Sequence, residues 1–284
     1  MNRALLYNPM KAGGWTLADG SEPIRTSTLN QFTQGPEWKR NALRGYNDHL
    51  LIWITRGQGR MILGGLRSGF GAHNAILVPA GTMVRFETSG QLFGTVIRIA
   101  PVLDVELPVD PVHMRIRNTV AQCEMTSFVD ALVAEQERKS NGHERASACL
   151  LGLISVWLSR QMIEDPQCDP RLQENDVQLI RAYSRMVETD HCTDKTVADY
   201  ADVLGISSEK LDQICLTNAE QSAETILKNR KHLCACERLA ESDVEICKVA
   251  ETLGYGSETS FAELFLNQSG ISPDSFRQKF REAA

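Results

Sequence analysis

The segment Ile246–Phe261, ICKVAETLGYGSETSF, repeats the pattern of an earlier segment, Val197–Leu211, VADYADVLGISSEKL. In both segments an alanine stands four residues before a glycine, a leucine stands directly before it, and a large apolar residue follows six or seven positions later. Two helices joined by a short turn that contains glycine form a helix-turn-helix unit, whose second helix can enter the major groove of DNA. The sequence therefore predicts two such units, joined by a long helix over Ala223–Ala240.

The rest of the C-terminal part is also predicted to be helical. Thr196 is a suitable N-cap residue, and Asp199 three positions later gives a pattern close to a capping box. Apolar residues that recur every three or four positions mark the helices themselves. The predicted helices span Asn175–Thr189, Thr196–Leu204, Ser208–Leu216, Val244–Leu253 and Ser257–Asn267.

A set of residues in this region carries a resemblance to a known family. They are Ala235, Leu239, Ile246–Ala250, Leu253–Tyr255, Ser260, Phe261, Phe265 and the ending Gly270–Arg277, GISPDSFR. With these residues the C-terminal third of the chain resembles the AraC/XylS family of bacterial transcription regulators. The resemblance implies an all-α DNA-binding domain of two helix-turn-helix units joined by a long helix. It also implies an N-terminal cupin-like sensor barrel followed by a helical dimerisation hairpin.

The N-terminal part has the pattern of an all-β sandwich or barrel, because short runs rich in β-branched and aromatic residues alternate with glycine-containing turns. The predicted strands are His49–Thr55, Arg60–Leu63, Ala75–Val78, Met83–Phe86 and Leu92–Ile99. Two helices are predicted after them, over Val120–Lys139 and Glu144–Met162. The second is apolar nearly all round, so it must be buried under the barrel or against another subunit.

The predicted fold class is α+β with more than one domain. The stretch Glu164–Arg171 contains two prolines and three acidic residues, which is typical of a linker. We therefore expect a cupin-like sensor barrel over residues 1–119, a helical dimerisation hairpin over 120–163, a linker over 164–174 and an AraC-type double helix-turn-helix domain over 175–284.

The charge of the chain is unevenly distributed. The whole chain has a net charge of −6, but residues 171–284 hold 13 Lys and Arg residues against 20 Asp and Glu residues, a net charge of −7. Neutralisation of phosphates supplies essentially all non-specific affinity for DNA and a large share of specific affinity. We therefore expect weaker DNA binding than is usual for the family, so that a dimer is needed for useful affinity.

The candidate DNA-binding residues lie mainly on the second helix of each unit. The candidates that face bases are Ser208, Glu209, Asp212, Gln213, Glu258, Thr259, Ser260, Ala262 and Glu263, and the candidates that contact phosphates are Lys210, Lys228, Arg230, Lys231, Arg277 and Lys279. Glu209 and Glu258 have an alternative role as carboxylates at the positive end of a helix dipole. Asp212 and Glu263 lie deeper in their helices, so we hypothesise that the domain keeps the AraC-type fold but has shifted or lost its groove contacts.

A small-molecule site is predicted in the N-terminal domain. Strand alternation places His49 and Trp53 on one face of their strand. An arginine opposite them, Arg85 or Arg98, would suit an anionic ligand. The alternative is that Trp53 is an ordinary core residue and that His49 is satisfied by its neighbours.

Metal and catalytic sites are not predicted. The turn Pro79–Thr82 matches a cupin metal site, but Val84 stands where the metal-ligating histidine would be, so neither a metal nor a cofactor is expected. Cys234 and Cys236 point in different directions if their segment is helical, so they cannot share an ion. No phosphate-binding loop, nucleophile elbow or paired-carboxylate site stands out, so an enzyme is not expected.

The sequence also bears on location. The most apolar segment, Ala148–Leu158, is shorter than the roughly 20 residues that cross a bilayer. Met1–Gly20 lacks the apolar stretch of a secretory signal. We therefore expect a cytoplasmic protein with no membrane contact, whose eight cysteines are mostly buried free thiols.

The resulting prediction is a transcription regulator that binds double-stranded promoter DNA, forms a homodimer and responds to a small-molecule ligand or a partner. RNA polymerase and another regulator are the candidate partners. The alternative is an AraC-like protein-interaction module, an anti-regulator with weak or no DNA binding, which fits the acidic recognition helices. A metal-dependent cupin enzyme ranks far behind both.

Overall fold

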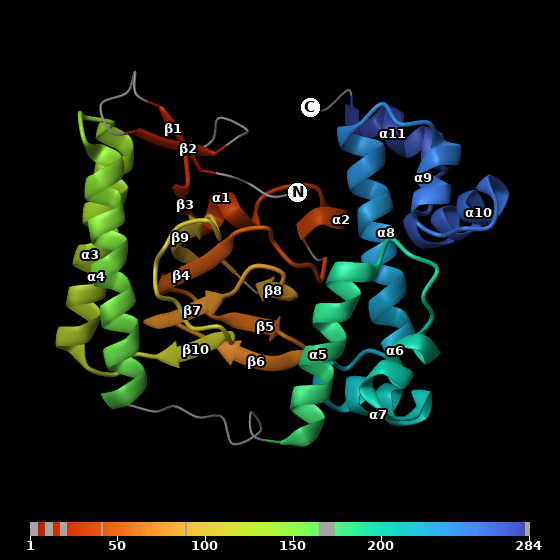
Figure 1. Ribbon diagram of the computed structural model, residues 1–284, viewed down its shortest axis with the longest axis horizontal. Coiled ribbons are helices and arrows are strands. Elements are labelled where there is room, and N and C mark those ends of the chain that lie inside the picture. Colours follow the sequence, from red (N-terminus) through yellow and green to blue (C-terminus); the bar gives the residue numbers. More distant parts are fainter. Residues whose placement is uncertain are drawn as a thin grey trace.

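The computed structural model describes residues 5–8, 14–17, 22–40, 42–88, 90–164 and 174–281. The elements form layers that follow one another across Figure 1. Two long helices, α3 (Thr119–Arg138) and α4 (His143–Glu164), cover one side of a β-sandwich, and the C-terminal helices cover the other side. The predicted combination of an N-terminal β domain and a C-terminal helical domain is confirmed.

Two antiparallel sheets build the sandwich. The larger sheet has the strand order β10-β7-β4-β9-β3, the smaller has the order β6-β5-β8, and β1 and β2 pair separately. The strands are β1 (Leu5–Asn8), β2 (Gly14–Leu17), β3 (Ile24–Thr28), β4 (His49–Arg56), β5 (Gly59–Leu63), β6 (Leu66–Phe70), β7 (Asn74–Val78), β8 (Val84–Thr88), β9 (Phe93–Ile99) and β10 (Val112–Arg115). All five predicted strands are present. β1, β2, β3, β6 and β10 were not predicted. In β3 and β6, Arg, Ser, Thr and Gly interrupt the apolar pattern.

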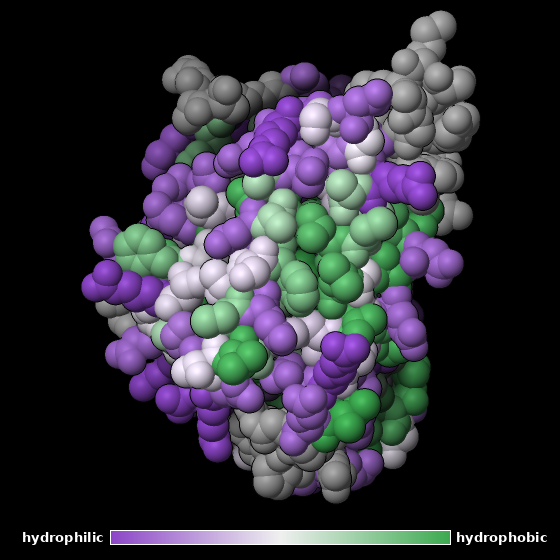
Figure 2. Space-filling model, turned by 90° about the vertical axis from the view of Figure 1, so that its left-hand side faces the viewer, coloured by the Kyte–Doolittle hydropathy of each residue, from purple (hydrophilic) through white to green (hydrophobic). Residues whose placement is uncertain are grey.

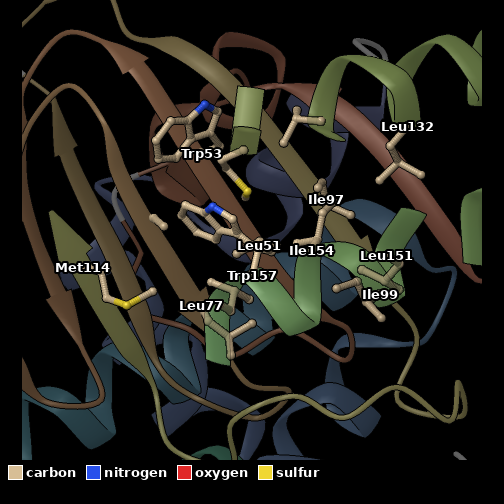
Figure 3. Close-up of a cluster of buried hydrophobic side chains, with 14 of the residues drawn as sticks. Leu51, Trp53, Leu77, Ile97, Ile99, Met114, Leu132, Leu151, Ile154 and Trp157 are labelled. Carbon is tan, nitrogen blue, oxygen red and sulfur yellow. The ribbon is translucent and has the colours of Figure 1, made fainter. Parts of the chain in front are cut away.

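The central strand β4 is buried on both faces, so alternation decides which layer each side chain enters. Leu50 and Ile52 pack into the core between the two sheets. Leu51 and Trp53 point the other way, into the core between the larger sheet and the helices α3 and α4. Figure 3 shows Trp53 beside Trp157 of α4, and their ring centroids lie 6.3 Å apart in an edge-to-face arrangement.

The pair α3 and α4 forms a helical hairpin close to the predicted positions. Asn118 caps α3 by accepting hydrogen bonds from the backbone N–H groups of Val120 and Ala121. Lys139 ends the helix in the left-handed conformation, with a φ of 46°. The inner sides of both helices join the core of the larger sheet, which explains why this hairpin is apolar on that side.

The outer side of α4 is also apolar. Its exposed large side chains are Leu153, Val156, Met162 and Ile163, with exposed fractions of 51%, 47%, 38% and 81%. Figure 2 views the molecule from the side of α3 and α4 and shows apolar side chains gathered on this face. By length and composition α4 is apolar enough to cross a membrane, but its inner side belongs to the core of the domain.

In its described residues the C-terminal part consists of helices and the turns between them, without strands. Its helices are α5 (Asn175–Asp190), α6 (Val197–Leu204), α7 (Ser208–Ala219), α8 (Ala223–Glu241), α9 (Ile246–Thr252), α10 (Glu258–Ser269) and α11 (Pro273–Arg281). Every predicted helix is present, whereas α11 was not predicted as a separate helix. Of the predicted linker, residues 165–173 lie outside the described residues.

The smaller sheet packs directly onto the C-terminal helices. Ile62 and Met83 share one core cluster with Ile180 and Tyr183 of α5. A Cβ atom added at Gly65 would lie 2.7 Å from Cγ1 of Ile180, so only glycine permits this approach between the two domains.

A short segment of the N-terminal domain also lies along the C-terminal helices. We call residues 37–40 and 42–46 the bridging segment; residues 37–40 form the short helix α2. The ring of Trp38 lies 5.6 Å from that of Phe276, Lys39 pairs with Glu241 at 2.7 Å, and Arg44 pairs with Glu237 at 3.2 Å. The bridging segment therefore connects the sandwich to α8 and α11.

Candidate nucleic-acid interface

The first helix-turn-helix unit consists of α6 and α7. The predicted capping box is present, because Asp199 accepts a hydrogen bond from the backbone of Thr196 at 2.7 Å and the Thr196 hydroxyl accepts one in return. Gly205 ends α6 in the left-handed conformation, with a φ of 68°. Ala201 and Leu211 are fully buried at the helix crossing, as the sequence predicted.

The second unit, α9 and α10, has the same construction. Gly254 makes the turn with a φ of 74°, and the Ser257 hydroxyl caps α10 by accepting from the backbone N–H of Ser260 at 3.1 Å. Ala250 and Phe261 are buried at the crossing in the positions that correspond to those of the first unit. The repeat in the sequence is therefore a structural repeat.

The helix α8 connects the two units. In Figure 1 it runs through the C-terminal part, with α6 and α7 near one end and α9 and α10 near the other. Its 19 residues correspond to a length of about 28 Å at 1.5 Å per residue. The two recognition helices are thus carried on one continuous support.

Most candidates that face bases are exposed on the recognition helices. Glu209 and Gln213 are exposed on α7, and Ser208 is half-buried. On α10 the exposed candidates are Glu258, Thr259, Ser260 and Glu263, whereas Ala262 is half-buried. Each helix also exposes apolar side chains that were not among the candidates, namely Leu216 on α7 and Leu264 and Leu266 on α10.

Asp212 does not fit the predicted role. It is half-buried, and its Oδ1 atom accepts a hydrogen bond of 2.9 Å from the backbone N–H of Ala223. Ala223 is the first residue of α8, where backbone N–H groups lack partners within the helix. Asp212 therefore caps α8 instead of facing a base.

The other acidic residues of these helices stay exposed. Glu209 lies in the first turn of α7, and hydrogen bonds from its own backbone N–H and from Ser207 lower its pKa. Glu258 is the first residue of α10, as expected for a carboxylate near the positive end of a helix dipole. Glu263 lies in the middle of α10, and in the part of the chain that the structure describes it has no ion-pair partner.

Two of the predicted phosphate contacts are structural residues instead. Arg230 is buried, and its Nε and guanidinium nitrogen atoms donate to both carboxylate oxygens of Glu188 at 2.8 Å. Burial lowers the pKa of Arg230, but its hydrogen bonds and attraction to Glu188 outweigh that effect and raise it. The Nζ atom of Lys231 donates to the backbone oxygen of Thr193 at 2.8 Å. Neither side chain is therefore available to a phosphate.

The remaining candidate cations lie nearer the surface, but most have partners. Lys210 pairs with Asp176 at 3.1 Å and Lys228 pairs with Glu224 at 2.7 Å. A guanidinium nitrogen of Arg277 donates to the backbone oxygen of Val244. Lys279 is exposed, with Nζ 5.4 Å from the ring centroid of Phe280.

The predicted ligand residues of the N-terminal domain are separated in the structure. Trp53 is 1% exposed in the core and donates from Nε1 to the Thr126 hydroxyl at 3.2 Å, so it does not line a pocket. The Nδ1 atom of His49 accepts a hydrogen bond from the backbone N–H of Ala80 at 3.2 Å, and burial lowers its pKa. Of the predicted ligand residues, Arg85 and Arg98 line a cavity of the domain, whereas His49 and Trp53 do not.

That cavity has a volume of about 1200 Å³ and lies beside the bridging segment. Arg40, Arg44, Arg85 and Arg98 line it, together with aromatic rings and one acidic residue, Glu87. Arg98 lies against two neighbouring rings, 5.3 Å from the centroid of Phe32 and 5.7 Å from that of Tyr46.

Arg98 also has an unusual electrostatic setting. Burial lowers its pKa, and no carboxylate among the described residues forms an ion pair with it. The sequence pattern identified Arg98 but missed Arg44 and the two rings. Those residues lie outside the predicted strands and reach the cavity only through the tertiary fold.

Comparisons with known proteins found a matching family model and similar solved structures. Residues 200–279 match the family model of a helix-turn-helix domain. Among solved structures, unsaturated fatty acid bound wild-type ToxT from Vibrio cholerae is similar over 90% of this chain and 91% of its own, with 12% identity and a TM-score of 0.43. The C-terminal domain of AraT, a response regulator from Geobacillus stearothermophilus, matches 36% of this chain and 84% of its own, with 24% identity and a TM-score of 0.34.

A third similar structure is the C-terminal domain of the two-component response regulator YesN from Fusobacterium nucleatum, which covers 34% of this chain and 93% of its own, with 19% identity and a TM-score of 0.33. No curated protein matches the chain. The repeated units, the connecting helix and the match over residues 200–279 lead to one conclusion. The chain carries a helix-turn-helix domain over residues 200–279.

Proposed function

We propose that this protein is a cytoplasmic transcription regulator that binds promoter DNA through both helix-turn-helix units and is controlled by a small anionic ligand in its N-terminal domain. The observation that carries this proposal is the repeated, exposed first turn of α7 and α10, held on the single helix α8. Two recognition helices on one support are suited to reading one stretch of duplex.

The dimensions of the domain support contact with successive major grooves. The length of α8, about 28 Å, is close to the roughly 34 Å of one turn of B-DNA. Gln213 on α7 and Thr259 and Ser260 on α10 offer polar groups to base edges.

The electrostatic attraction of this domain to DNA phosphates is weak, so the proposal requires a dimer. The exposed acids of α7 and α10 repel phosphates, and Arg230 and Lys231 are occupied within the domain. Pairing two copies through the exposed apolar side of α4 would double the number of DNA contacts. Leu153, Val156 and Ile163 supply that surface.

The arginine-lined cavity is the proposed ligand site. Arg98 is half-buried against two aromatic rings and has no ion-pair partner in the described residues, so a carboxylate or phosphate group there would gain a charge-assisted hydrogen bond. The cavity volume of about 1200 Å³ is sufficient for a small molecule.

Arg44 offers a route from the cavity to the DNA-binding domain. It lines the cavity, stacks on Tyr46 at 4.6 Å and pairs with Glu237 of α8 at 3.2 Å. A bound anion would compete with Glu237 for Arg44 and so change how the bridging segment holds α8. The DNA-binding domain would then take a different position on the promoter, and this would change its contact with RNA polymerase.

The first test is genome-wide immunoprecipitation of DNA bound by the tagged full-length protein. We expect discrete peaks that disappear when Gln213, Thr259 and Ser260 are together replaced by alanine. The matched control replaces Ser127 and Asn141, which are exposed in the N-terminal domain, by alanine and should keep every peak. Peaks that survive in the triple variant would contradict direct reading through α7 and α10.

The exposed leucines of the recognition helices favour a second candidate function. Leu216, Leu264 and Leu266 are 49%, 46% and 47% exposed, beside the acids Glu209 and Glu263. Such a surface suits a protein partner, as in an anti-regulator that binds another regulator. Recovery of one protein partner, no DNA peaks, and binding that does not weaken steeply with salt would support this second function, because DNA binding falls steeply as salt rises.

A further inference from the structure

Three potential metal ligands meet between the end of α5 and the middle of α8. His191 follows the last residue of α5, Cys192 comes next, and Cys234 lies on α8. Their ligand atoms all lie within 4.8 Å of one another, and the two sulfur atoms are 3.7 Å apart. His191 and Cys234 are each 8% exposed, whereas Cys192 is half-buried.

The distance between the sulfur atoms suits a shared ion. With metal–sulfur bonds of about 2.3 Å and tetrahedral angles, two thiolates bound to one zinc ion lie about 3.8 Å apart. The observed 3.7 Å agrees with this value. Bringing in the histidine nitrogen requires a side-chain adjustment of about 1 Å, since the group spans up to 4.8 Å.

One ring nitrogen of the histidine is held by the backbone. Its Nδ1 atom lies 2.9 Å from the backbone oxygen of Glu188 and 3.2 Å from that of Val187. Carbonyl oxygens only accept, so Nδ1 carries the proton and Nε2 keeps its lone pair. Metal-ligating histidines almost always hold their other ring nitrogen in this way.

The two chain segments are fixed next to each other on both sides of the cluster. Three residues before His191, Glu188 forms two hydrogen bonds of 2.8 Å with Arg230, which precedes Cys234 by one helical turn. After Cys192, the backbone oxygen of Thr193 accepts from Lys231 at 2.8 Å. The ligands are therefore held in place by the surrounding structure, which is what a metal site requires.

We propose that His191, Cys192 and Cys234 bind one thiophilic metal ion with a filled d shell, Zn²⁺ or Cu⁺, at the junction of the two helix-turn-helix units. Thiolate and imidazole donors select ions of this type. Among the described residues no fourth His, Cys, Asp or Glu joins the group, so water would complete a tetrahedral site.

The position of the cluster gives the ion a structural role. The backbone of residues 193 and 194 packs against the turn of the second unit, where a Cβ atom at Gly254 would lie 2.9 Å from the Thr193 oxygen. An ion on Cys192 would therefore tie α5, α8 and the second turn together. It would fix the position of one recognition helix relative to the other.

The positive charge of Arg238 affects the two ions differently. Its side chain contacts both Cys192 and Cys234. Two thiolates and Cu⁺ leave one negative charge that a guanidinium can balance, whereas two thiolates and Zn²⁺ leave none. Binding of Cu⁺ in preference to Zn²⁺ would identify the monovalent ion as the occupant.

The test is a titration of the reduced, full-length protein without oxygen. Each ion is supplied alone, and a chromophoric chelator competes with the protein for it. We expect one ion per chain and a rise in melting temperature with ion concentration. Loss of a residue that only supports a metal ligand weakens metal binding roughly 10–100-fold. The Cys192→Ser variant removes a ligand itself, so it should weaken binding by more than that. Because Cys192 is half-buried, this variant should fold normally, which circular dichroism checks.

The matched control is Cys236→Ser. Cys236 lies on the same helix, but its sulfur contacts Nε2 of His232 at 3.5 Å and is not one of the three ligand atoms. This control should bind the ion as the unchanged protein does. The proposal is overturned if neither ion binds at one per chain, if Cys192→Ser binds as tightly as the unchanged protein, or if only Cys236→Ser loses binding.

Discussion

The carboxylate of Asp212 lies on a predicted recognition helix but is used inside the domain. It accepts the backbone N–H of Ala223 at 2.9 Å and so satisfies one of the free donors at the start of α8. Glu209, three residues earlier, is exposed and accepts hydrogen bonds from its own backbone N–H and from Ser207. Two acids three residues apart therefore have different roles, which their spacing alone does not reveal.

We predict that Asp212→Ala destabilises the protein by about 1–2 kcal/mol, because the backbone N–H of the buried Ala223 loses its charged partner. The exposed Glu209→Ala should change the unfolding free energy by less than about 0.5 kcal/mol. Denaturant unfolding of both variants provides the comparison. Equal effects would show that Asp212 does not cap α8.

His49 gives the N-terminal domain a pH dependence. Burial lowers its pKa below 6.5, and the charge of Asp48 opposes that effect only in part. Its Nδ1 atom accepts from Ala80, which requires the neutral ring. The unfolded chain binds the proton more readily, so stability contributed by His49 is present above pH 6.5 and is lost as the pH falls through the folded pKa.

The expected result is an unfolding free energy that decreases from pH 7.5 to pH 5 more steeply in the unchanged protein than in His49→Gln. Glutamine still offers an oxygen to Ala80 but does not titrate. Urea unfolding at a series of pH values measures the two slopes, and parallel slopes would refute this role for His49.

The turn between α9 and α10 contains two glycines, and only one of its two positions requires glycine. Gly254 has a φ of 74°, and an added Cβ atom would lie 2.9 Å from the backbone oxygen of Thr193. Gly256, two residues later, has open space around its Cβ position and no positive φ. The two glycines of one turn therefore differ in what they contribute.

Gly254→Ala is expected to destabilise the domain by about 2 kcal/mol, because the left-handed conformation and the backbone contact are both unfavourable to a side chain. Gly256→Ala should be neutral or slightly stabilising. Thermal unfolding distinguishes them. A loss of stability in Gly256→Ala as large as in Gly254→Ala would contradict the argument.

Contacts between domains are concentrated on a few side chains. One carboxylate, Glu188, accepts two hydrogen bonds from the buried Arg230 of α8 and one of 2.9 Å from the backbone N–H of Gly45 in the bridging segment. Another contact, between Lys39 and Glu241, is exposed. Their energetic contributions should therefore differ.

Glu188→Ala would leave Arg230 buried without its partner, at an expected cost of about 3–5 kcal/mol, whereas Glu241→Ala should cost about 1 kcal/mol or less. Hydrogen exchange should also increase in the bridging segment of the first variant. Equal stability of the two variants would contradict the cost assigned to leaving Arg230 buried without Glu188.

The exposed apolar side of α4 predicts association of the whole molecule. Sedimentation at tens of micromolar should show a dimer, and Leu153→Glu combined with Val156→Glu should shift it to a monomer by placing charges in an apolar interface. As a control, Ser127→Ala on α3 should leave the sedimentation profile unchanged. A monomer for the unchanged protein would exclude this interface.

The sequence by itself determined the periodic elements and the repeat. Alanine, leucine and glycine at fixed spacing specify a helix crossing and its turn, and alternation along His49–Thr55 correctly separated the two faces of β4, because both patterns depend on neighbours close along the chain. The same local signals predicted the capping box at Thr196 and Asp199.

Only the tertiary structure decided which of these residues are available to a ligand. Trp53 lies in a core because α3 and α4 cover its face of the sheet, and Arg230 is occupied because Glu188 reaches it from another helix. Cys192 and Cys234 meet although they are 42 residues apart. Such contacts depend on how distant segments pack, and no local pattern in the sequence encodes them.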